Sequence, residues 1–359
     1  MKIAAAISGG VDSIRAAILL REEGHEVFGI HMRCLPCPGE PGEIHRIVDE
    51  RERPLRQLAA RCQIPIVIID LREQFDTLVV RPFVEAYMHG LTPNPCIECN
   101  PRVKFGLLLD EAIKLGAERM ATGHYARLKP PARTNQNFQL RRGKDPAKDQ
   151  SYFLMGLNQQ QLARVLFPLG EHTKQQTLAW AEQTGIKPLL TEESQEICFI
   201  ASGDYTDFVR KRHRGEDTAQ SGPILDLSGN LLGRHNGIHS YTVGQRRGLG
   251  IPSTAPYYVI RIEPESNVVR IGRSKDLFCE MFAVSRVNWI SIDRPDGPIT
   301  CEVRIRNLHR PAQAEVTPLG AAAALVRFFE PQRAVTPGQA AVFYSGDLLL
   351  GGGIIDRHS

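Results

Sequence analysis

Residues 8–13 of this chain read Ser-Gly-Gly-Val-Asp-Ser, and this hexapeptide decides how the N-terminal part folds. An apolar run, residues 3–7, precedes it, and apolar side chains recur three and four residues apart after it, so the pattern predicts a strand, a tight loop and a helix. The two glycines allow a sharp turn that brings backbone N–H groups close to an anion, and Ser13 is expected to cap the helix. A phosphate suits such a helix N-terminus, and the Asp12 carboxylate suits a magnesium ion that binds pyrophosphate oxygens.

The loop lacks two common nucleotide-binding signatures. It has neither the Gly-Lys-Ser/Thr ending of a Walker A loop nor the spaced glycines of a dinucleotide fingerprint. The sequence therefore argues against a γ-phosphate-cleaving NTPase and against a dehydrogenase. It resembles instead the pyrophosphate loop of the ATP pyrophosphatases, enzymes that adenylate a carbonyl oxygen and expel pyrophosphate.

Length and composition set broad limits. The 359 residues exceed one ordinary core and predict two or three domains. A hydrophobic content of 42%, a charged content of 23% and the lack of an apolar run long enough to span a bilayer lead us to expect a cytoplasmic protein. The net charge of +4 confines any nucleic-acid surface to a local basic patch. Eight cysteines in a cytosolic chain are expected to be catalytic, metal-binding or buried rather than disulfide-bonded.

Alternating strand and helix patterns after the loop predict a Rossmann-like parallel sheet, and hence the α/β class. Strands are expected at residues 25–32 and 64–69, with a helix at about residues 52–62 between them. Ligands bind beyond the carboxyl ends of such strands, so we expect the loop and residues 123–125 at one rim of the sheet. His124 is expected to be exposed there.

Three cysteine-containing stretches have chemical interest. Cys34 and Cys37 lie in a Pro/Gly-rich segment, where an irregular surface loop is preferred over half of a zinc site. Residues 91–100 read Leu-Thr-Pro-Asn-Pro-Cys-Ile-Glu-Cys-Asn, and the two prolines predict a rigid loop that presents two thiols. Cys198 has apolar neighbours, and a cysteine in that setting is usually buried unless another thiol can reach it.

The rest of the chain predicts two amphipathic helices, at about residues 159–166 and 173–184, followed by β structure. Past Arg214, turn signals separate short alternating runs, which predict a small β-rich module and then a C-terminal β-barrel. We therefore expect an α/β catalytic domain, a small β-rich central domain and a barrel domain, over residues 1–212, 213–274 and 275–359.

Several sequence motifs, taken together, make the chain similar to the bacterial tRNA-specific 2-thiouridylases over nearly its whole length. In order, they are SGGVDS (8–13), TPNP with Cys99 and Asn100, ATGHY (121–125), KDQSYFL (148–154), SQEICFI (194–200), GQRRGL (244–249) and PGQ (337–339). So many motifs in one order are more specific than any one of them.

The resemblance implies an ATP-dependent sulfurtransferase that thiolates C2 of the wobble uridine of tRNA. ATP adenylates the C2 carbonyl oxygen and pyrophosphate leaves. A persulfide on Cys198 then supplies sulfur, and Cys99 is the catalytic nucleophile that can form a disulfide with Cys198. These residue types make chemical sense, because a cysteine thiolate or persulfide is a soft nucleophile near neutral pH. The target base also has to turn out of its stack.

The resemblance also assigns site residues and partners. ATP, with magnesium on Asp12, is assigned to Ala6, Ile7, Ser8, Gly9, Gly10, Val11, Asp12, Ser13, Met32 and Gly123. The target base and tRNA are assigned to Asn94, Pro95, Cys96, His124, Lys148, Asp149, Gln150, Arg306, Asn307 and Gln339. The expected partners are tRNA, bound in part by the barrel, and a sulfur-donor protein, either a sulfur relay protein or a cysteine desulfurase. We expect a monomer without a membrane partner.

The chain departs from the family pattern at two of these positions. Cys96 stands where the family usually has aspartate, and Asn307 where it commonly has tyrosine, so a stacking ring is missing from that tRNA contact. Cys96, Cys99 and Cys198 could instead ligate three irons of a [4Fe-4S] cluster. Persulfide transfer is favoured, because Cys99 and Cys198 suffice for thiol exchange.

Two other function classes share the loop. One is an amide-forming ligase, such as the argininosuccinate and GMP synthetases, and the other is an RNA-binding protein that holds ATP only as a structural ligand.

Overall fold

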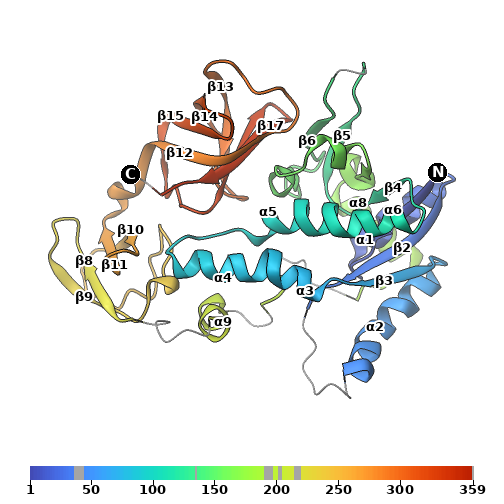
Figure 1. Cartoon of the computed structure of the whole chain (residues 1–359), viewed down its shortest axis with the longest axis horizontal. Coiled ribbons are helices and arrows are strands. Elements are labelled where there is room, and N and C mark those ends of the chain that lie inside the picture. Colours follow the sequence, from blue (N-terminus) through green and yellow to red (C-terminus); the bar gives the residue numbers. More distant parts are fainter. Residues whose placement is uncertain (36–43, 134–135, 190–196, 201–203, 214–219, 358–359) are drawn as a thin grey trace. The chain divides into compact units, whose positions relative to one another are not determined.

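The computed structural model describes residues 1–35, 44–133, 136–189, 197–200, 204–213 and 220–357, with backbone alone at 44–49 and 51 (Figure 1). The chain divides into two compact units. Unit 1 comprises Met1–Leu78, Cys96–Gln195 and Asp347–Leu349, and unit 2 comprises Val79–Pro95, Glu196–Gly346 and Leu350–Ser359. No helix in the described ranges combines the length and the apolar character needed to cross a membrane.

Unit 1 is built on a five-stranded parallel sheet in the order β3-β2-β1-β4-β7. The strands are β1 (Lys2–Ala6), β2 (Glu26–Arg33), β3 (Ile66–Asp70), β4 (Arg119–Ala121) and β7 (Val165–Leu166). The central strand β1 pairs with β2 on one side and β4 on the other. Its side chains are buried on both faces, which explains a continuous apolar run instead of alternation. The expected α/β fold with a parallel sheet is confirmed.

Helices of unit 1 flank this sheet. The main ones are α1 (Val11–Glu22), α2 (Ile44–Arg61) and α8 (Lys174–Thr184), and short ones are α3 (Arg72–Phe75), η3 (Ser151–Leu154), α7 (Gln159–Leu162) and η4 (Pro168–Glu171). The π-helical turn η1 (Asp76–Val80) begins in unit 1 and ends in unit 2. The helix expected over residues 159–166 is wrong in its second half. There Val165 and Leu166 pair with β4 as the fifth strand of the sheet, a contact with a distant segment that overrides the local helical pattern.

Residues 95–114 form one continuous helical segment, made of α5 (Pro95–Cys99), the π-helical stretch η2 (Asn100–Leu108) and α6 (Leu109–Lys114). The expectation of a rigid loop over residues 91–100 is therefore wrong from Pro95 onward. Pro95 is the first helical residue, where a missing N–H has no cost and the fixed φ favours the helix. Pro101 lacks the donor for a regular helical bond, and the chain continues with π spacing.

A hairpin of β5 (Ala126–Lys129) and β6 (Gln139–Arg142) completes unit 1. Asp347 ties it down through ion pairs with Arg127 at 2.6 Å and Arg141 at 2.9 Å.

Unit 2 contains a small sheet and a closed barrel. The small sheet has the order β10-β11-β8-β9, from β8 (Gly222–Leu225), β9 (Leu231–His235), β10 (Tyr258–Glu263) and β11 (Val268–Gly272). The barrel has the order β12-β15-β14-β13-β16-β17 and closes through the pairing of β12 with β17. Its strands are β12 (Phe278–Trp289), β13 (Ile299–Arg304), β14 (Ala312–Leu319), β15 (Ala323–Arg333), β16 (Ala340–Ser345) and β17 (Leu348–Ile355). The expected C-terminal β-barrel is confirmed.

Unit 2 also has the helices α4 (Arg81–Met88) and α9 (Tyr205–Arg212) and the short turns η5 (Ile238–Ser240) and η6 (Ser274–Leu277). The two helices share an apolar cluster in which Tyr87 packs on Tyr205 with ring centroids 4.5 Å apart and Phe83 packs on Phe199 at 5.2 Å. This cluster supports the segment that carries Cys198.

Candidate functional site

The loop of residues 8–13 joins the carboxyl end of β1 to helix α1. Gly9 has φ +91°, a left-handed conformation that favours glycine. Gly10 caps the helix through its backbone, without a side-chain hydrogen bond. The expectation that Ser13 caps α1 is wrong, because Ser13 is the third helical residue and its hydroxyl points back into the loop. That hydroxyl donates to the Gly10 carbonyl at 2.8 Å and accepts the Ser8 N–H at 3.2 Å, so it closes the loop.

Gly123 lies against the first turn of α1. A Cβ built on Gly123 would be 2.8 Å from the carbonyl carbon of Asp12 and 2.9 Å from the backbone nitrogen of Ser13. Only a residue without a side chain fits this close approach. The structure therefore brings together the loop and the segment after β4, which sequence reasoning placed at the same rim.

The Asp12 carboxylate is held by side chains from two other elements. The Lys174 ammonium donates to its two oxygens at 2.8 and 2.7 Å, and the Tyr125 hydroxyl lies 2.8 Å from Oδ1. Thr177 Oγ1 is 3.0 Å from the same hydroxyl. Burial is the main cause that raises the pKa of Tyr125, so its hydroxyl stays protonated and can donate.

Sequence reasoning did not single out Lys174. Its only local signal is a capping box, in which Thr173 caps α8 and the Gln176 side chain accepts the Thr173 N–H at 2.8 Å. A capping box identifies a helix start but not the partner of the lysine that follows it.

The neighbouring strand β2 contributes His31 and Met32 beside β1. His31 Nδ1 lies 2.6 Å from the Ile7 carbonyl, just before the loop. Burial lowers the pKa of His31, so the neutral imidazole donates this hydrogen bond and fixes the end of β1. Met32 is half-buried near the carboxyl end of β2, and its assignment to the nucleotide stays a prediction.

His124 is packed rather than exposed, which corrects the expectation for this residue. Its ring lies 5.7 Å from that of Phe105 and 6.1 Å from that of Phe167, and its Nδ1 lies 2.7 Å from Thr122 Oγ1. The chain turns at Gly123, so the side chain falls over these rings instead of pointing into solvent. Desolvation holds the pKa of His124 well below its usual value, so the ring is neutral.

The segment of residues 148–150 makes internal contacts. Asp149 is buried, and its carboxylate accepts the N–H groups of Gly143 at 3.2 Å and Ser151 at 3.0 Å. Gln150 Oε1 accepts the N–H of Tyr125 at 3.0 Å, while Lys148 is half-buried. These contacts give Asp149 and Gln150 a structural role, and the assignment of all three residues to tRNA stays a prediction.

The two thiols of the Cys96-x-x-Cys99 motif lie on one helix, α5. Cys96 is exposed and Cys99 is buried with 7% of its surface exposed. Cys198 is exposed and belongs to unit 2, so the expectation of a buried cysteine is wrong. Because Cys99 belongs to unit 1, its approach to Cys198 stays a prediction.

Cys34 and Cys37 belong to the other cysteine-containing stretch. Cys34 is half-buried, and Cys37 lies outside the described residues. Within the ranges that the structure describes, no group of three or more His, Cys, Asp or Glu side chains is arranged to hold a metal ion.

The other tRNA candidates lie in unit 2. Gln339 donates its amide to the Thr92 carbonyl at 2.7 Å, and the Thr92 N–H donates to the Pro337 carbonyl at 2.9 Å. These bonds hold the segment that leads to Asn94, which is half-buried, and Pro95, which is buried. Arg306 is exposed beyond β13, and the half-buried Asn307 accepts a short hydrogen bond from the Arg304 guanidinium through its carbonyl.

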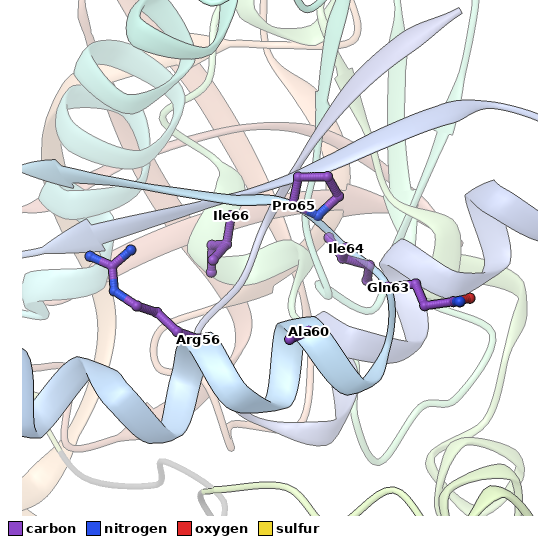
Figure 2. Close-up of a pocket in the computed structure, with 6 residues that line it drawn as sticks. All are labelled: Arg56, Ala60, Gln63, Ile64, Pro65 and Ile66. Atoms are coloured by element: carbon purple, nitrogen blue, oxygen red, sulfur yellow. The ribbon is translucent and has the colours of Figure 1, made fainter.

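A hollow of about 430 Å³ lies at another place in unit 1, between α2 and the start of β3 (Figure 2). Its lining residues are Arg56, Ala60, Gln63, Ile64, Pro65 and Ile66. They lie at the amino end of β3, whereas the loop of residues 8–13 follows the carboxyl end of β1. In a parallel sheet the amino and carboxyl ends of the strands lie on opposite sides, so the hollow is not part of the candidate site.

Fold and site together define a class: a multidomain protein whose α/β unit has a closed, glycine-containing loop between a strand and a helix N-terminus and whose later part is a β-barrel. Three family models match the chain, described as tRNA methyl transferase HUP domain over residues 1–202, tRNA methyl transferase PRC-barrel domain over 207–273 and aminomethyltransferase beta-barrel domain over 279–355.

Curated relatives make the assignment specific. The tRNA-specific 2-thiouridylase MnmA of Geotalea uraniireducens is 44% identical, over 99% of this chain and 95% of that protein. The protein of the same name from Desulfosudis oleivorans is 43% identical, over 98% and 94%. This chain belongs to the MnmA family of tRNA-specific 2-thiouridylases, so the resemblance inferred from its motifs is confirmed. The solved U34-tRNA thiolase NcsA from Methanococcus maripaludis, with its [4Fe-4S] cluster, is more distant, at 18% identity and a TM-score of 0.34 over 60% of this chain and 68% of that one.

Proposed function

We propose that this protein is a tRNA-uridine 2-sulfurtransferase that uses ATP to thiolate C2 of the wobble uridine. The observation that carries the proposal is the closed loop of residues 8–13, found in a chain that belongs over its full length to the 2-thiouridylase family. We further propose that it acts in the cytoplasm as a monomer and receives sulfur from a donor protein.

The loop is suited to the pyrophosphate part of ATP. Its backbone N–H groups stand at the N-terminus of α1, where the helix dipole favours negative charge. Asp12 fits a magnesium ion, because a carboxylate oxygen can take a second partner beside the bond that Oδ2 accepts from Lys174. When bound, the ion would neutralise charge on the phosphate oxygens. Met32 would pack against the adenine.

The proposed chemistry has three steps. The C2 oxygen of uridine attacks the α-phosphorus of ATP, and the bond to pyrophosphate breaks. The terminal sulfur of a Cys198 persulfide then attacks C2, and the oxygen leaves with AMP. Finally the Cys99 thiolate attacks the Cys198 sulfur, which leaves the transferred sulfur on the base and forms a Cys99–Cys198 disulfide. A cellular thiol reduces this disulfide before the donor protein reloads Cys198.

One observation favours a second mechanism for the same product. Cys96 and Cys99 are three residues apart on α5, a spacing at which two thiolates can serve one cluster. Cys96, Cys99 and Cys198 would then hold a [4Fe-4S] cluster, which would offer an open iron to bind sulfide.

The test uses anaerobically purified protein, ATP, unmodified tRNA, a sulfur source (a cysteine desulfurase with cysteine, or sulfide) and a thiol reductant. AMP, pyrophosphate and nucleoside 2-thiouridine are measured by mass spectrometry. We expect tRNA-dependent AMP release and one 2-thiouridine per AMP. Cys99→Ser and Cys198→Ser should lose 2-thiouridine but keep ATP binding, and Cys279→Ser should match the wild type.

The alternatives predict other results. A colourless, iron-free protein that thiolates tRNA would exclude the cluster, and joint loss of iron and activity in Cys96→Ser would establish it. Unimpaired release of AMP and pyrophosphate by Cys99→Ser and Cys198→Ser would indicate an amide-forming ligase. Absence of tRNA-dependent AMP release would indicate an RNA-binding protein.

A further inference from the structure

We propose that Lys174 is a positioning residue of the nucleotide site, which holds the Asp12 carboxylate in place and balances its charge beside the phosphate loop. The inference rests on the proposed ATP-dependent function. It goes beyond that function, because Lys174 is not among the residues that the family resemblance assigns to the site.

Lys174 is an unusually buried lysine in a well-fixed position. Only 9% of its surface is exposed, and a lysine at that depth needs a partner for its charge. Its ammonium group bonds both oxygens of Asp12, at 2.8 and 2.7 Å. Its backbone N–H donates to Asp145 Oδ2 at 2.9 Å, which fixes the first residue of α8. Both ends of the lysine are therefore tied down.

Two separate segments converge on the one carboxylate of α1. Asp12 lies in the first turn of α1, Tyr125 follows β4, and Lys174 begins α8. The Tyr125 hydroxyl and the Lys174 ammonium both reach Oδ1, at 2.8 Å each. Such convergence sets the direction of the Asp12 carboxylate, two residues after the glycine turn.

The charge of Lys174 has a consequence for ATP. A half-buried carboxylate in the loop repels an incoming triphosphate, because like charges interact strongly where water is scarce. The ammonium group offsets that repulsion and fixes the orientation of the carboxylate through its two bonds. Loss of Lys174 should therefore weaken ATP binding more than it slows turnover.

The competing explanation is that the ion pair only joins α1 to α8. A purely structural role would lower thermal stability but leave the ATP affinity of the folded enzyme unchanged. Two measurements distinguish the explanations. One is the dissociation constant (Kd) for a non-hydrolysable ATP analogue with magnesium, measured by calorimetry, and the other is kcat for tRNA-dependent AMP release.

We expect Lys174→Met to raise the Kd by about ten- to hundredfold, the effect of losing a charge-assisted bond, with kcat within about threefold of wild type. Lys174→Arg should retain most of the affinity, because it keeps the charge. Lys144→Met, the same change at an exposed lysine, should match the wild type. Because Lys174 acts through Asp12, the Asp12→Asn/Lys174→Met double variant should bind no more weakly than Asp12→Asn alone.

A wild-type Kd in folded Lys174→Met, or additive losses in the double variant, would overturn the proposal. If Lys174→Met does not fold, Tyr125→Phe removes only a hydroxyl from the same carboxylate. That variant should raise the Kd by about threefold or more, and a wild-type Kd would equally overturn the proposal. A wild-type enzyme that releases no AMP with tRNA contradicts the proposed function, whereas the Kd comparison among variants tests how the Asp12 carboxylate is held.

Discussion

Replacing Gly123 with alanine adds one methyl group at the closest contact of the candidate site. The added Cβ would lie 2.8 Å from the carbonyl carbon of Asp12, and ordinary contacts begin at 3.4 Å, so the backbone must separate by about 0.6 Å. Gly123 does not have a left-handed φ, so the alanine backbone itself is not strained. The cost is therefore steric, and it falls on the first turn of α1.

The size of the effect follows from this overlap. Overpacking a rigid contact costs about 1–3 kcal/mol of unfolding free energy. The displaced backbone belongs to the segment that we propose donates N–H groups to phosphate, so the hydrogen bonds to ATP should weaken as well. Loss of one charge-assisted bond corresponds to about a tenfold higher Kd or more.

Urea unfolding and calorimetric ATP binding measure the two effects. Gly297→Ala is the matched control, because a Cβ there meets nothing within 4 Å and the residue is not left-handed. It should change neither quantity by more than about 0.5 kcal/mol. If Gly123→Ala proved as stable as the control and bound ATP as tightly as the wild type, the close packing inferred for the loop would be wrong.

Three further predictions concern single polar groups. Ser13→Ala removes the hydroxyl that closes the loop, so urea unfolding should show a loss of about 1–2 kcal/mol with weaker ATP binding; an unchanged Kd would mean that the loop keeps its shape unaided. Asp149→Ala leaves two N–H groups without their acceptor and should lower the unfolding free energy by about 2–4 kcal/mol; wild-type stability with weaker tRNA binding would instead support a tRNA contact. Hydrogen bonds from Arg72 are the main cause that lowers the pKa of Asp70 to about 2. Because the folded-state pKa lies below the unfolded value of about 3.9, this stabilisation is present above about pH 4 and is lost toward pH 2. The stability difference between wild type and Asp70→Asn should shrink over that range, and a constant difference would contradict the assignment.

The sheet and the loop could be predicted because their signals are local. The apolar run of residues 3–7, the two glycines after it and the helical period that follows are enough to define a strand, a turn and a helix. The two-residue strand β7 could not be predicted, because Val165 and Leu166 become a strand only by pairing with β4. The helix at Pro95 was missed for another reason: proline disfavours a helix interior, but a sequence does not reveal which residue is the first of a helix.

The site was predictable only where a residue type carries chemistry by itself. Cysteines and a glycine-containing loop attract notice in any sequence, whereas Lys174 is one of 44 lysines and arginines. Its distinction is burial against Asp12, a residue 162 positions away. No local pattern reports such a contact, so it became visible only in the fold.

The motif at residues 148–150 shows how a family resemblance and a physical contact can give different reasons for the same residues. The resemblance assigns these residues to tRNA. In the structure, Gln150 Oε1 accepts the Tyr125 N–H, and the Gln150 N–H donates to the Tyr125 carbonyl, each at 3.0 Å. The hydroxyl of Tyr125 in turn reaches Asp12 at 2.8 Å. The motif is therefore connected through Tyr125 to the loop of residues 8–13. A loss of activity after substitution of Gln150 is then not by itself evidence for a tRNA contact. ATP affinity and tRNA affinity have to be measured separately at this position.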